Sequence, residues 1–455
     1  MPPKPRKKPA YELLYEEIRN DILTGKLKNK ERIPSKRMLA EMHGVSVVTV
    51  ENALAQLAAE GYVTMIPRSG TYVGYHGDIL RPPEGSPLPP AEEEPPDPPA
   101  SGAAALFPFS VWARLMRTVL LEQGSRLLRP VRGGGVYELR AAIADYLYRC
   151  RGMRVSPEQI FVGAGSEDLY TQAARLLGRE LLYAAESPGY ETTERLYRLN
   201  GAKTVRIPLD EQGLSVSALR ESGADVAHIS PAHHFPTGIV MPISRRREIM
   251  RWAEEKEGRY IVEDDYDSEF RRAGIPVPAM FGMGSERVIY INTFSQTLAP
   301  SVRIGYMCLP PSLIPLRRER LGFCACPVPS FEQYTLAKFI AEGYFERHIS
   351  RVRKFARRAA ELSEAIFIKN GAWITESGAG LHFRITAKNA EETIHRLEDC
   401  GLRIRPIGSY FAGEKGAAEN LVAGYENQFV VSYGNADEEA LLRLSEEMER
   451  GPRLL

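Results

Sequence analysis

The sequence contains little cysteine, no long apolar run and no excess of charge of either sign. Its five cysteines are scattered among 455 residues, as is typical of free thiols in a reducing cytoplasm. No eighteen consecutive residues are apolar, so we expect no membrane-spanning helix and no membrane partner. Lys and Arg total 59 against 58 Asp and Glu, so net charge alone does not indicate a nucleic-acid partner.

The N-terminal residues also lack the features of a secretion signal. The segment MPPKPRKKPAYELL is basic but has no apolar core and no small-residue cleavage site, which favours a cytoplasmic protein. The pair Cys324 and Cys326 has no second Cys or His pair at ligand spacing, so we assign no metal or redox site to it.

Proline is concentrated in one segment that marks a domain boundary. Residues 81–100 read RPPEGSPLPPAEEEPPDPPA, with almost nothing to bury. Such a segment favours extended polyproline II and acts as a semi-rigid linker. We therefore expect an N-terminal domain over residues 1–78, a linker over residues 79–105 and a larger domain over residues 106–455.

The N-terminal domain has the pattern of three short helices and a hairpin. Apolar residues recur at helical spacing over residues 11–22 and 35–43. Ser46 can cap a third helix, because its hydroxyl can accept from free amide hydrogens. The buried stripe of that helix comprises Val50, Ala53, Leu54, Leu57 and Ala58. Two alternating segments follow, over residues 62–66 and 70–75, so the order predicts a winged helix-turn-helix.

The larger domain alternates apolar segments with amphipathic ones. The predicted strands are QIFVGAG, ELLYAAE, TVRIPLD, VAHIS, RYIVEDD, VIYINTF and RIGYMCLP. This alternation favours an α/β fold with a mainly parallel sheet. We expect a large subdomain at about residues 155–315. A small subdomain should contain residues 316–455 together with residues 106–150.

Motifs of the N-terminal domain resemble the GntR superfamily of bacterial winged-helix regulators. The matching motifs include Pro34-Ser35-x-Arg37, Gly44-Val45-Ser46-x-x-Thr49-Val50 and Gly70-Thr71-Tyr72-Val73. The resemblance implies binding to double-stranded operator DNA, with one helix in the major groove. The candidate DNA-binding residues are Ser35, Arg37, Ser46, Thr49, Asn52, Arg68 and Gly70.

One position departs from the GntR pattern. Val47 stands where the family often has Arg, so Val47 and Val48 could contact a thymine methyl group instead. The basic residues 4–8 should add non-specific attraction to phosphate. The alternative is a vestigial domain that makes only protein contacts.

From about Leu106 onward, the sequence resembles the MocR/GabR subfamily, in which a GntR-type domain is fused to a fold-type I aminotransferase-like domain. The most specific motifs are EDDYDSEF at residues 263–270 and TFSQTLAPSVRIGY at residues 293–306. The resemblance covers nearly all of the remaining sequence. It implies a homodimer in which each winged helix reaches across to the partner subunit, and a two-fold dimer would read paired half-sites.

The same resemblance implies a site for pyridoxal phosphate. This cofactor needs a stacking aromatic ring, a carboxylate at its pyridine nitrogen, an anion site and a lysine amine. Tyr190 matches the stacking ring, Asp264 the carboxylate and Tyr266 the hydroxyl that faces the ring oxygen. The anion site is matched by Gly165, Ser166, Ser295 and Arg303.

The lysine requirement is not met. Where the family has Ser-Lys-x-Leu, this sequence has Gln296 after Ser295, and no lysine lies between Lys256 and Lys338. An amide cannot form a Schiff base, so we expect no covalent pyridoxal phosphate and no transamination. Pyridoxal phosphate or a related small effector could still bind non-covalently.

Further departures accompany Gln296. Tyr410 stands where the family commonly has an arginine for the amino-acid carboxylate, and Glu167-Asp168 stand where it often has Gln. Acidic side chains there would repel a phosphate if they pointed at it. His233-His234 have no carboxylate or third His at ligand spacing, so we predict no metal site.

These observations favour a cytoplasmic transcriptional regulator whose aminotransferase-like domain is inactive and serves effector sensing and dimerisation. One alternative is a pyridoxal-phosphate-dependent aminotransferase with an accessory DNA-binding domain, against which Gln296 argues directly. Another is an effector-free DNA-binding scaffold. The sequence does not identify the operator or the effector.

Overall fold

The computed structural model describes residues 9–75, 102–272, 278–369, 371–375, 378–386, 391–411, 425 and 427–450. The chain divides into two compact units, residues 1–98 and 99–455. Most of the expected linker, like the basic residues 4–8, lies outside the described residues. Residues 102–105 of that expected linker form a short helix, α4 (Gly102–Ala105), and the Ala103 amide donates to the Gly434 carbonyl at 2.9 Å.

Residues 9–75 of the first unit form three helices and a two-stranded hairpin, as predicted. The elements are α1 (Ala10–Leu23), α2 (Lys36–His43), α3 (Val47–Ala59), β1 (Val63–Ile66) and β2 (Gly70–Val73). The hydroxyl of Ser35 accepts from the Met38 amide at 3.3 Å, and that of Ser46 accepts from the Thr49 amide at 3.1 Å. Both serines therefore satisfy amide groups that a helix start leaves free.

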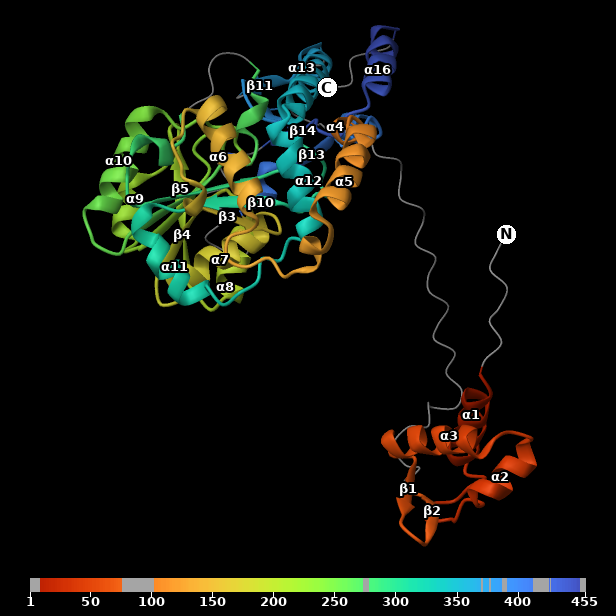
Figure 1. Ribbon diagram of the computed structural model, residues 1–455. Helices are drawn as coiled ribbons and strands as arrows, with labels where there is room; N and C mark the ends of the chain where they lie inside the picture. The colour runs from red at the N-terminus through yellow and green to blue at the C-terminus, as the bar shows by residue number, and fades with distance from the viewer. Residues whose placement is uncertain are drawn as a thin grey trace. The chain divides into compact units, whose positions relative to one another are not determined.

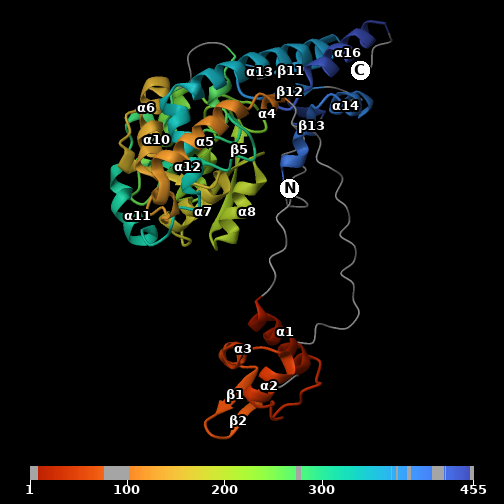
Figure 2. The same ribbon diagram turned by 45° about the vertical axis from the view of Figure 1, so that its right-hand side comes forward.

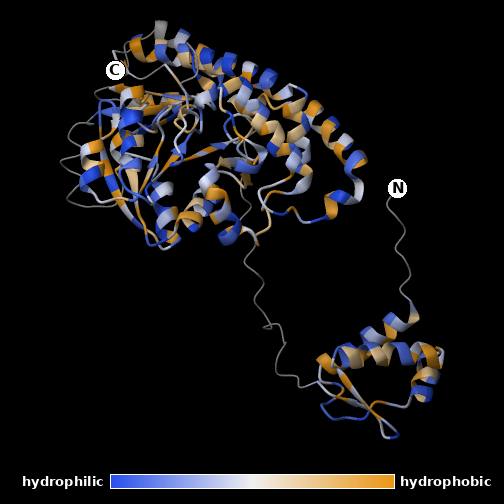
Figure 3. Cartoon of the chain, turned by 60° about the vertical axis from the view of Figure 1, so that its left-hand side comes forward, coloured by the Kyte–Doolittle hydropathy of each residue, from blue (hydrophilic) through white to orange (hydrophobic). Residues whose placement is uncertain are grey.

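The core of the first unit comes from one face of each helix. Val50, Ala53, Leu54 and Leu57 of α3 are fully buried, and they pack against Leu14, Ile18 and Ile22 of α1. The hairpin joins this core through the antiparallel pair Val63 and Val73. Figure 3 shows hydrophobic and hydrophilic residues mixed along the helices, as amphipathic helices on a core require.

The second unit is built on an eight-stranded sheet. Its order is β3-β10-β9-β8-β7-β4-β5-β6. The strands are β3 (Ile160–Gly163), β4 (Leu182–Ser187), β5 (Lys203–Asp210), β6 (Gly213–Leu214), β7 (Val226–Ile229), β8 (Tyr260–Asp264), β9 (Val288–Thr293) and β10 (Gly305–Cys308). Neighbours from β5 through β4, β7 and β8 to β9 are parallel, whereas β10 is antiparallel to both of its neighbours. The prediction of a mainly parallel sheet is confirmed.

Helices cover both faces of this sheet, as Figure 1 shows. One core contains residues of α7 (Ser166–Leu177), α8 (Glu191–Leu199) and α11 (Ile314–Leu321). Another contains residues of α9 (Val216–Glu221) and α10 (Ile243–Glu254). Strands covered on both faces are buried along their whole length, and β7 and β9 accordingly have no exposed residue.

Residues 106–150, which we expected in the small subdomain, pack in one core with strands of the large sheet. They form α5 (Phe109–Gln123) and α6 (Tyr137–Arg151), which pack with α12 (Ser330–Ala341). Leu115, Leu139 and Ile143 share one core with strand residues of β3 and β10. The physical reason is this shared apolar core, to which no described residue of the small sheet contributes.

A second, smaller sheet follows in the chain. Its order is β11-β12-β14-β13, with β11 (Trp373–Thr375), β12 (His382–Thr386), β13 (Arg403–Pro406) and β14 (Gln428–Ser432) all paired antiparallel. The helices of this region are α13 (Tyr344–Lys369), α14 (Glu391–Glu398) and α16 (Glu438–Arg450). Figure 2 shows α13 as one long helix that reaches α16.

Short 3₁₀ helices complete the described structure. They are η1 (Gly124–Leu128), η2 (Pro157–Gln159), η3 (Ser268–Phe270), η4 (Phe281–Met283), η5 (Pro311–Leu313) and η6 (Ile407–Tyr410). Among the residues that the structure describes, none of the helices is long and apolar enough to cross a lipid bilayer.

Candidate DNA-binding surface and effector site

The exposed face of α2 and α3 carries most of the candidate DNA-binding residues. Arg37 and Asn52 are exposed, because the buried stripe of each helix points the other way. Thr49 is half-buried, and its hydroxyl lies 2.8 Å from that of Ser46. Val47 and Val48 are 41 % and 63 % exposed at the start of α3. These apolar side chains lie where a recognition helix presents its first turn.

Arg68 lies at the tip of the hairpin. Its φ of 61° is left-handed, and the side chain is exposed. Gly70 has a φ of 136°, and a Cβ atom there would lie 2.9 Å from Nε of Arg32. The positive φ favours glycine at this position, and the Arg32 guanidinium lies close to this turn end of the hairpin. The sequence motifs did not single out Arg32, whose side chain is exposed.

The candidate effector residues gather at one edge of the large sheet. Asp264 ends β8, while Ser166 and Tyr190 follow β3 and β4. Ser295 follows β9 at the same edge, because these parallel strands end there. Arg303 precedes β10, and an antiparallel strand begins at the edge where its parallel neighbours end. This edge is where ligands of open α/β sheets generally bind.

Asp264 lies in a buried polar cluster. Its Oδ2 atom accepts a hydrogen bond from the Tyr170 hydroxyl at 2.6 Å and lies 3.9 Å from Nε2 of His228. Burial and the neighbouring Asp264 hold the pKa of Tyr170 well above its usual value, so the phenol stays a donor. The Tyr266 hydroxyl is buried with no hydrogen-bond partner among the described residues.

Tyr170 and His228 were missed by the sequence analysis. Tyr170 lies four residues after Ser166, one helical turn into α7, so it shares a face with a predicted site residue. His228 is the one polar residue of the strand segment VAHI, and β7 pairs directly with β8. A polar residue inside an apolar strand beside Asp264 was the available signal.

Glu186 ends β4 close to the same cluster. Its Oε2 atom accepts from the Ser230 amide at 2.9 Å and lies 3.4 Å from Nε2 of His234. Burial raises the pKa of Glu186 to about 8, which keeps this carboxyl protonated near neutral pH. Burial lowers the pKa of His234 to about 3, so the pair is uncharged rather than ionic.

The anion site begins at Gly165 and Arg303. Gly165 has a φ of 89°, and a Cβ atom there would lie 2.8 Å from Nη2 of Arg303. Only glycine allows the guanidinium to approach the start of α7 this closely. Nη2 of Arg303 also lies 3.3 Å from a carboxylate oxygen of Glu167, and both side chains are about half exposed.

The two acidic residues after Ser166 therefore point in different directions. Glu167 pairs with Arg303, the side chain that was matched to the phosphate. The Asp168 carboxylate accepts hydrogen bonds from the Ala164 amide at 2.9 Å and from the Gln172 side chain at 2.7 Å. A phosphate at Arg303 would have to displace the Glu167 carboxylate.

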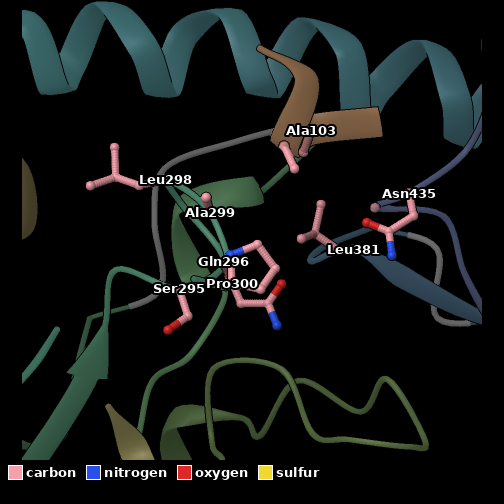
Figure 4. A pocket seen from close by; sticks show the side chains of 10 residues that line it. Ala103, Ser295, Gln296, Leu298, Ala299, Pro300, Leu381 and Asn435 are labelled. Carbon is pink, nitrogen blue, oxygen red and sulfur yellow. The ribbon is translucent and has the colours of Figure 1, made fainter. Parts of the chain in front are cut away.

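Gln296 lies in the loop after β9, and its side chain is exposed. Figure 4 shows it beside Ser295 and Pro300, with Leu381 and Asn435 on the opposite wall. The pocket between these walls has a volume of about 30 Å³. That volume holds about one water molecule and is far smaller than a typical ligand pocket.

Aromatic rings line the other side of the site. Phe235 lies perpendicular to Tyr190 at 6.4 Å and to Tyr410 at 5.1 Å between ring centroids. Tyr410 is held beside the large sheet through its carbonyl, which accepts from the Gly189 amide at 3.4 Å. Tyr190 is 47 % exposed, so its ring face is available for stacking.

These residues fit pyridoxal phosphate only in part. The Asp264 carboxylate and the unpartnered Tyr266 hydroxyl suit the pyridine nitrogen and the ring oxygen. Arg303 suits the phosphate once Glu167 moves away. The Gln296 amide does not suit the aldehyde, because it offers no amine. The covalent form of the cofactor does not fit this site.

Comparisons with known proteins match both units. Residues 10–73 match the family model of bacterial regulatory proteins of the gntR family. Residues 100–410 match aminotransferase class I and II. The multiple substrate aminotransferase of Thermococcus profundus has a similar structure, with a TM-score of 0.63 and 23 % identity over 77 % of this chain and 91 % of that one. That likeness concerns the fold alone.

Relatives that share both units are regulators. The "Uncharacterized HTH-type transcriptional regulator YdeL" of Bacillus subtilis is 34 % identical over 88 % of this chain and 89 % of its own. The "Probable rhizopine catabolism regulatory protein MocR" of Rhizobium meliloti is 33 % identical over 89 % and 87 %. PdxR of Corynebacterium glutamicum, an "HTH-type pyridoxine biosynthesis transcriptional regulator", is 29 % identical over 94 % and 92 %. This chain therefore belongs to the MocR/GabR subfamily of GntR-type transcriptional regulators, in which a winged helix is joined to an aminotransferase-like domain.

Proposed function

We propose that this protein is a DNA-binding regulator whose aminotransferase-like domain is catalytically inactive and holds a small effector non-covalently. The observation that carries the proposal is Gln296, which stands where an aminotransferase needs its Schiff-base lysine. Without that amine, neither capture of an aldehyde nor the associated proton transfer has a side chain to perform it.

The polar cluster around Asp264 supports retention of ligand binding. Asp264, Tyr170 and Tyr266 place a carboxylate and two hydroxyl groups at the carboxyl edge of the sheet. Tyr190 offers an exposed ring face, and Arg303 offers a guanidinium. Pyridoxal phosphate, or an aromatic anion of similar size, has the chemistry to use these groups.

The decisive experiment is the substitution Gln296→Lys. We expect purified parent protein mixed with pyridoxal phosphate to show no imine absorbance and no borohydride-stable label. The variant should gain both, because its amine would reach the aldehyde of a cofactor already held by the ring-side residues. Imine formation in the parent would contradict the inactive assignment.

A matched control distinguishes a site that no longer binds the cofactor from a site that lacks only the lysine amine. Gln296→Lys combined with Asp264→Asn should gain less absorbance, because the pyridine nitrogen would lose its carboxylate partner. If Gln296→Lys binds no pyridoxal phosphate while its circular dichroism remains native, the site does not hold this cofactor.

An effector-free scaffold is the second candidate. Glu167 pairs with Arg303 and so partly compensates the charge that a phosphate would use. Under this alternative, calorimetric titration with pyridoxal phosphate would give no heat for the parent, and DNA affinity would not respond to the cofactor.

We also infer a homodimer that binds double-stranded operator DNA. The support on the second unit is a set of exposed apolar side chains along α5 and η1, namely Phe109, Leu120, Leu121 and Leu128. A dimer interface that includes this segment would cover these side chains. Light scattering of the full chain should give twice the monomer mass, and a monomer at micromolar concentration would contradict this inference.

A further inference from the structure

Three buried side chains from separate segments meet where the two sheets of the second unit adjoin. His233 lies in the loop after β7, Asp267 precedes η3, and His382 begins β12. They are 1 %, 1 % and 3 % exposed. Each offers one ligand atom, and the three atoms lie within 4.8 Å of one another. The expectation that no carboxylate or third histidine accompanies His233 is therefore wrong.

A hydrogen bond shows which ring nitrogen of His233 donates. Its Nδ1 atom lies 2.8 Å from Oδ2 of Asp267, and a carboxylate is an acceptor, so Nδ1 donates. With Nδ1 as the donor, Nε2 is the ring nitrogen that can bind a metal ion. That Nε2 atom is buried and has no hydrogen-bond partner among the described residues.

His382 also has a buried Nε2 atom without a hydrogen-bond partner in the described part of the chain. The two imidazole rings lie 4.1 Å apart between centroids.

Two buried Nε2 atoms without hydrogen-bond partners, beside one carboxylate, favour the binding of a cation. Histidines that bind metal generally donate their other ring nitrogen to a carboxylate or a backbone carbonyl, as His233 does here. Imidazole ligands favour zinc and similar transition metals, whereas magnesium and calcium favour oxygen ligands. The Asp267 carboxylate offsets part of the charge of a divalent ion in this buried place.

The spacing of the ligand atoms is compatible with an ion of this class. Zinc–nitrogen bonds of about 2.0–2.1 Å place tetrahedral ligand atoms roughly 3.4 Å apart, so small side-chain rotations suffice. Gly380, with a φ of 68°, adjoins both His233 and Asp267, and a Cβ atom at this position would collide with both. Only glycine therefore lets the chain pass this close to the His233–Asp267 pair.

We propose that His233, Asp267 and His382 form a binding site for a zinc-class divalent ion that joins the small sheet to the large one. His233 and His382 supply imidazole ligands, the Asp267 carboxylate orients His233 and contributes charge, and water completes the coordination. The site is separate from DNA binding, and its existence does not depend on whether pyridoxal phosphate binds.

Metal uptake by the full chain tests this proposal. Protein stripped with a chelator is dialysed against micromolar Zn²⁺, and bound metal is measured by elemental mass spectrometry. We expect one ion per chain for the parent and a large loss for His382→Gln. His395→Gln is the matched control, because that histidine is 84 % exposed on α14, and its uptake should equal the parent's. No uptake by the parent, or equal uptake by His382→Gln, would overturn the proposal.

A cobalt spectrum keeps the proposal testable if His382→Gln does not fold. Co²⁺ bound to the parent should show visible ligand-field bands without a thiolate charge-transfer band in the near ultraviolet. A thiolate band would place the ion on cysteines such as Cys324 and Cys326 and refute the site. Asp267→Asn should weaken binding by roughly 10–100-fold, the usual effect of losing such a carboxylate.

Discussion

Two adjacent acidic residues begin α7, and their side chains serve different partners. Asp168 accepts from the Ala164 amide and so helps to fix the turn between β3 and α7. Glu167 instead pairs with the Arg303 guanidinium, which is the positive group that an anionic ligand would use. Since both members of the Glu167–Arg303 pair are about half exposed, solvent screens the pair and a stronger anion can displace Glu167.

We therefore expect Glu167→Gln to strengthen binding of pyridoxal phosphate or inorganic phosphate. The amide leaves Arg303 uncompensated, so the anion no longer competes with a carboxylate. Arg303→Ala should weaken the same binding, and both effects are measurable by isothermal titration calorimetry. Asp168→Asn provides a contrast, because that carboxylate does not face Arg303. Weaker phosphate binding in Glu167→Gln would show that this carboxylate does not compete for the site.

Glu186 leads to an expectation about pH. Its folded-state pKa of about 8 exceeds the unfolded value of about 4.3, so the folded state keeps a proton that the unfolded state releases. The free energy of unfolding should therefore fall as pH rises from about 4 to 8. Glu186→Gln should flatten this dependence, because the amide is neutral throughout.

Urea unfolding at a series of pH values measures the effect of Glu186. The exposed Glu211 offers a matched control, and Glu211→Gln should leave the pH dependence close to that of the parent. Burial also raises the pKa values of Glu263 and Glu269 to about 7, so part of the slope should persist in Glu186→Gln. An identical slope in parent and Glu186→Gln would argue against a protonated Glu186.

At the scale of single elements, the helices of the first unit present one polar face and one buried face. Arg37 lies on the exposed face of α2, two residues after the Ser35 cap. Helix starts and nearby guanidinium groups are common partners of DNA phosphates. Arg37→Ala should therefore weaken binding to a duplex from the gene's own upstream region.

The salt dependence of binding identifies the kind of contact that Arg37 makes. Loss of one phosphate contact should reduce the slope of log affinity against log salt by about 1, whereas loss of a base contact should relax specificity at one position. Lys26→Ala removes the same charge at a residue outside α2 and α3. Lys26 pairs with Asp21, and this variant should change DNA binding little. Equal affinity for Arg37→Ala and the parent would refute the contact.

The secondary structure of both units was largely predictable because local patterns encode it. The capping roles of Ser35 and Ser46 can be recognised from their local sequence. The strand segments are mostly apolar because helices cover both faces of the sheet. Packing between distant segments was not predictable in this way. The placement of α5 and α6 on the large sheet depends on which apolar faces meet, and helical periodicity does not specify the partner.

The candidate site was predictable only where family motifs cover it. Asp264 and Arg303 lie in such motifs, whereas the Glu167–Arg303 pair joins positions 136 residues apart. The cluster of His233, Asp267 and His382 was likewise not predictable. The loop after β7 and the first residue of β12 come together only in the completed fold. No local spacing carries that information.

At the scale of the whole molecule, the two sheets of the second unit share a helix. The first half of α13 contributes Phe345 and Ile349 to the core under the large sheet. Its second half contributes Ala359 and Phe367 to the core of the small sheet. A single continuous helix of 26 residues therefore belongs to both cores.

This sharing makes the thermal behaviour of the two sheets interdependent. If the small sheet melted alone, the second half of α13 would lose its packing. An isolated helix as short as this half is only marginally stable in water. We expect scanning calorimetry of residues 99–455 to give a single heat-absorption peak for both sheets. Ala359→Gly, in the half that packs on the small sheet, should lower the temperature of that one peak rather than split it, because melting that begins at either sheet spreads along the helix to the other.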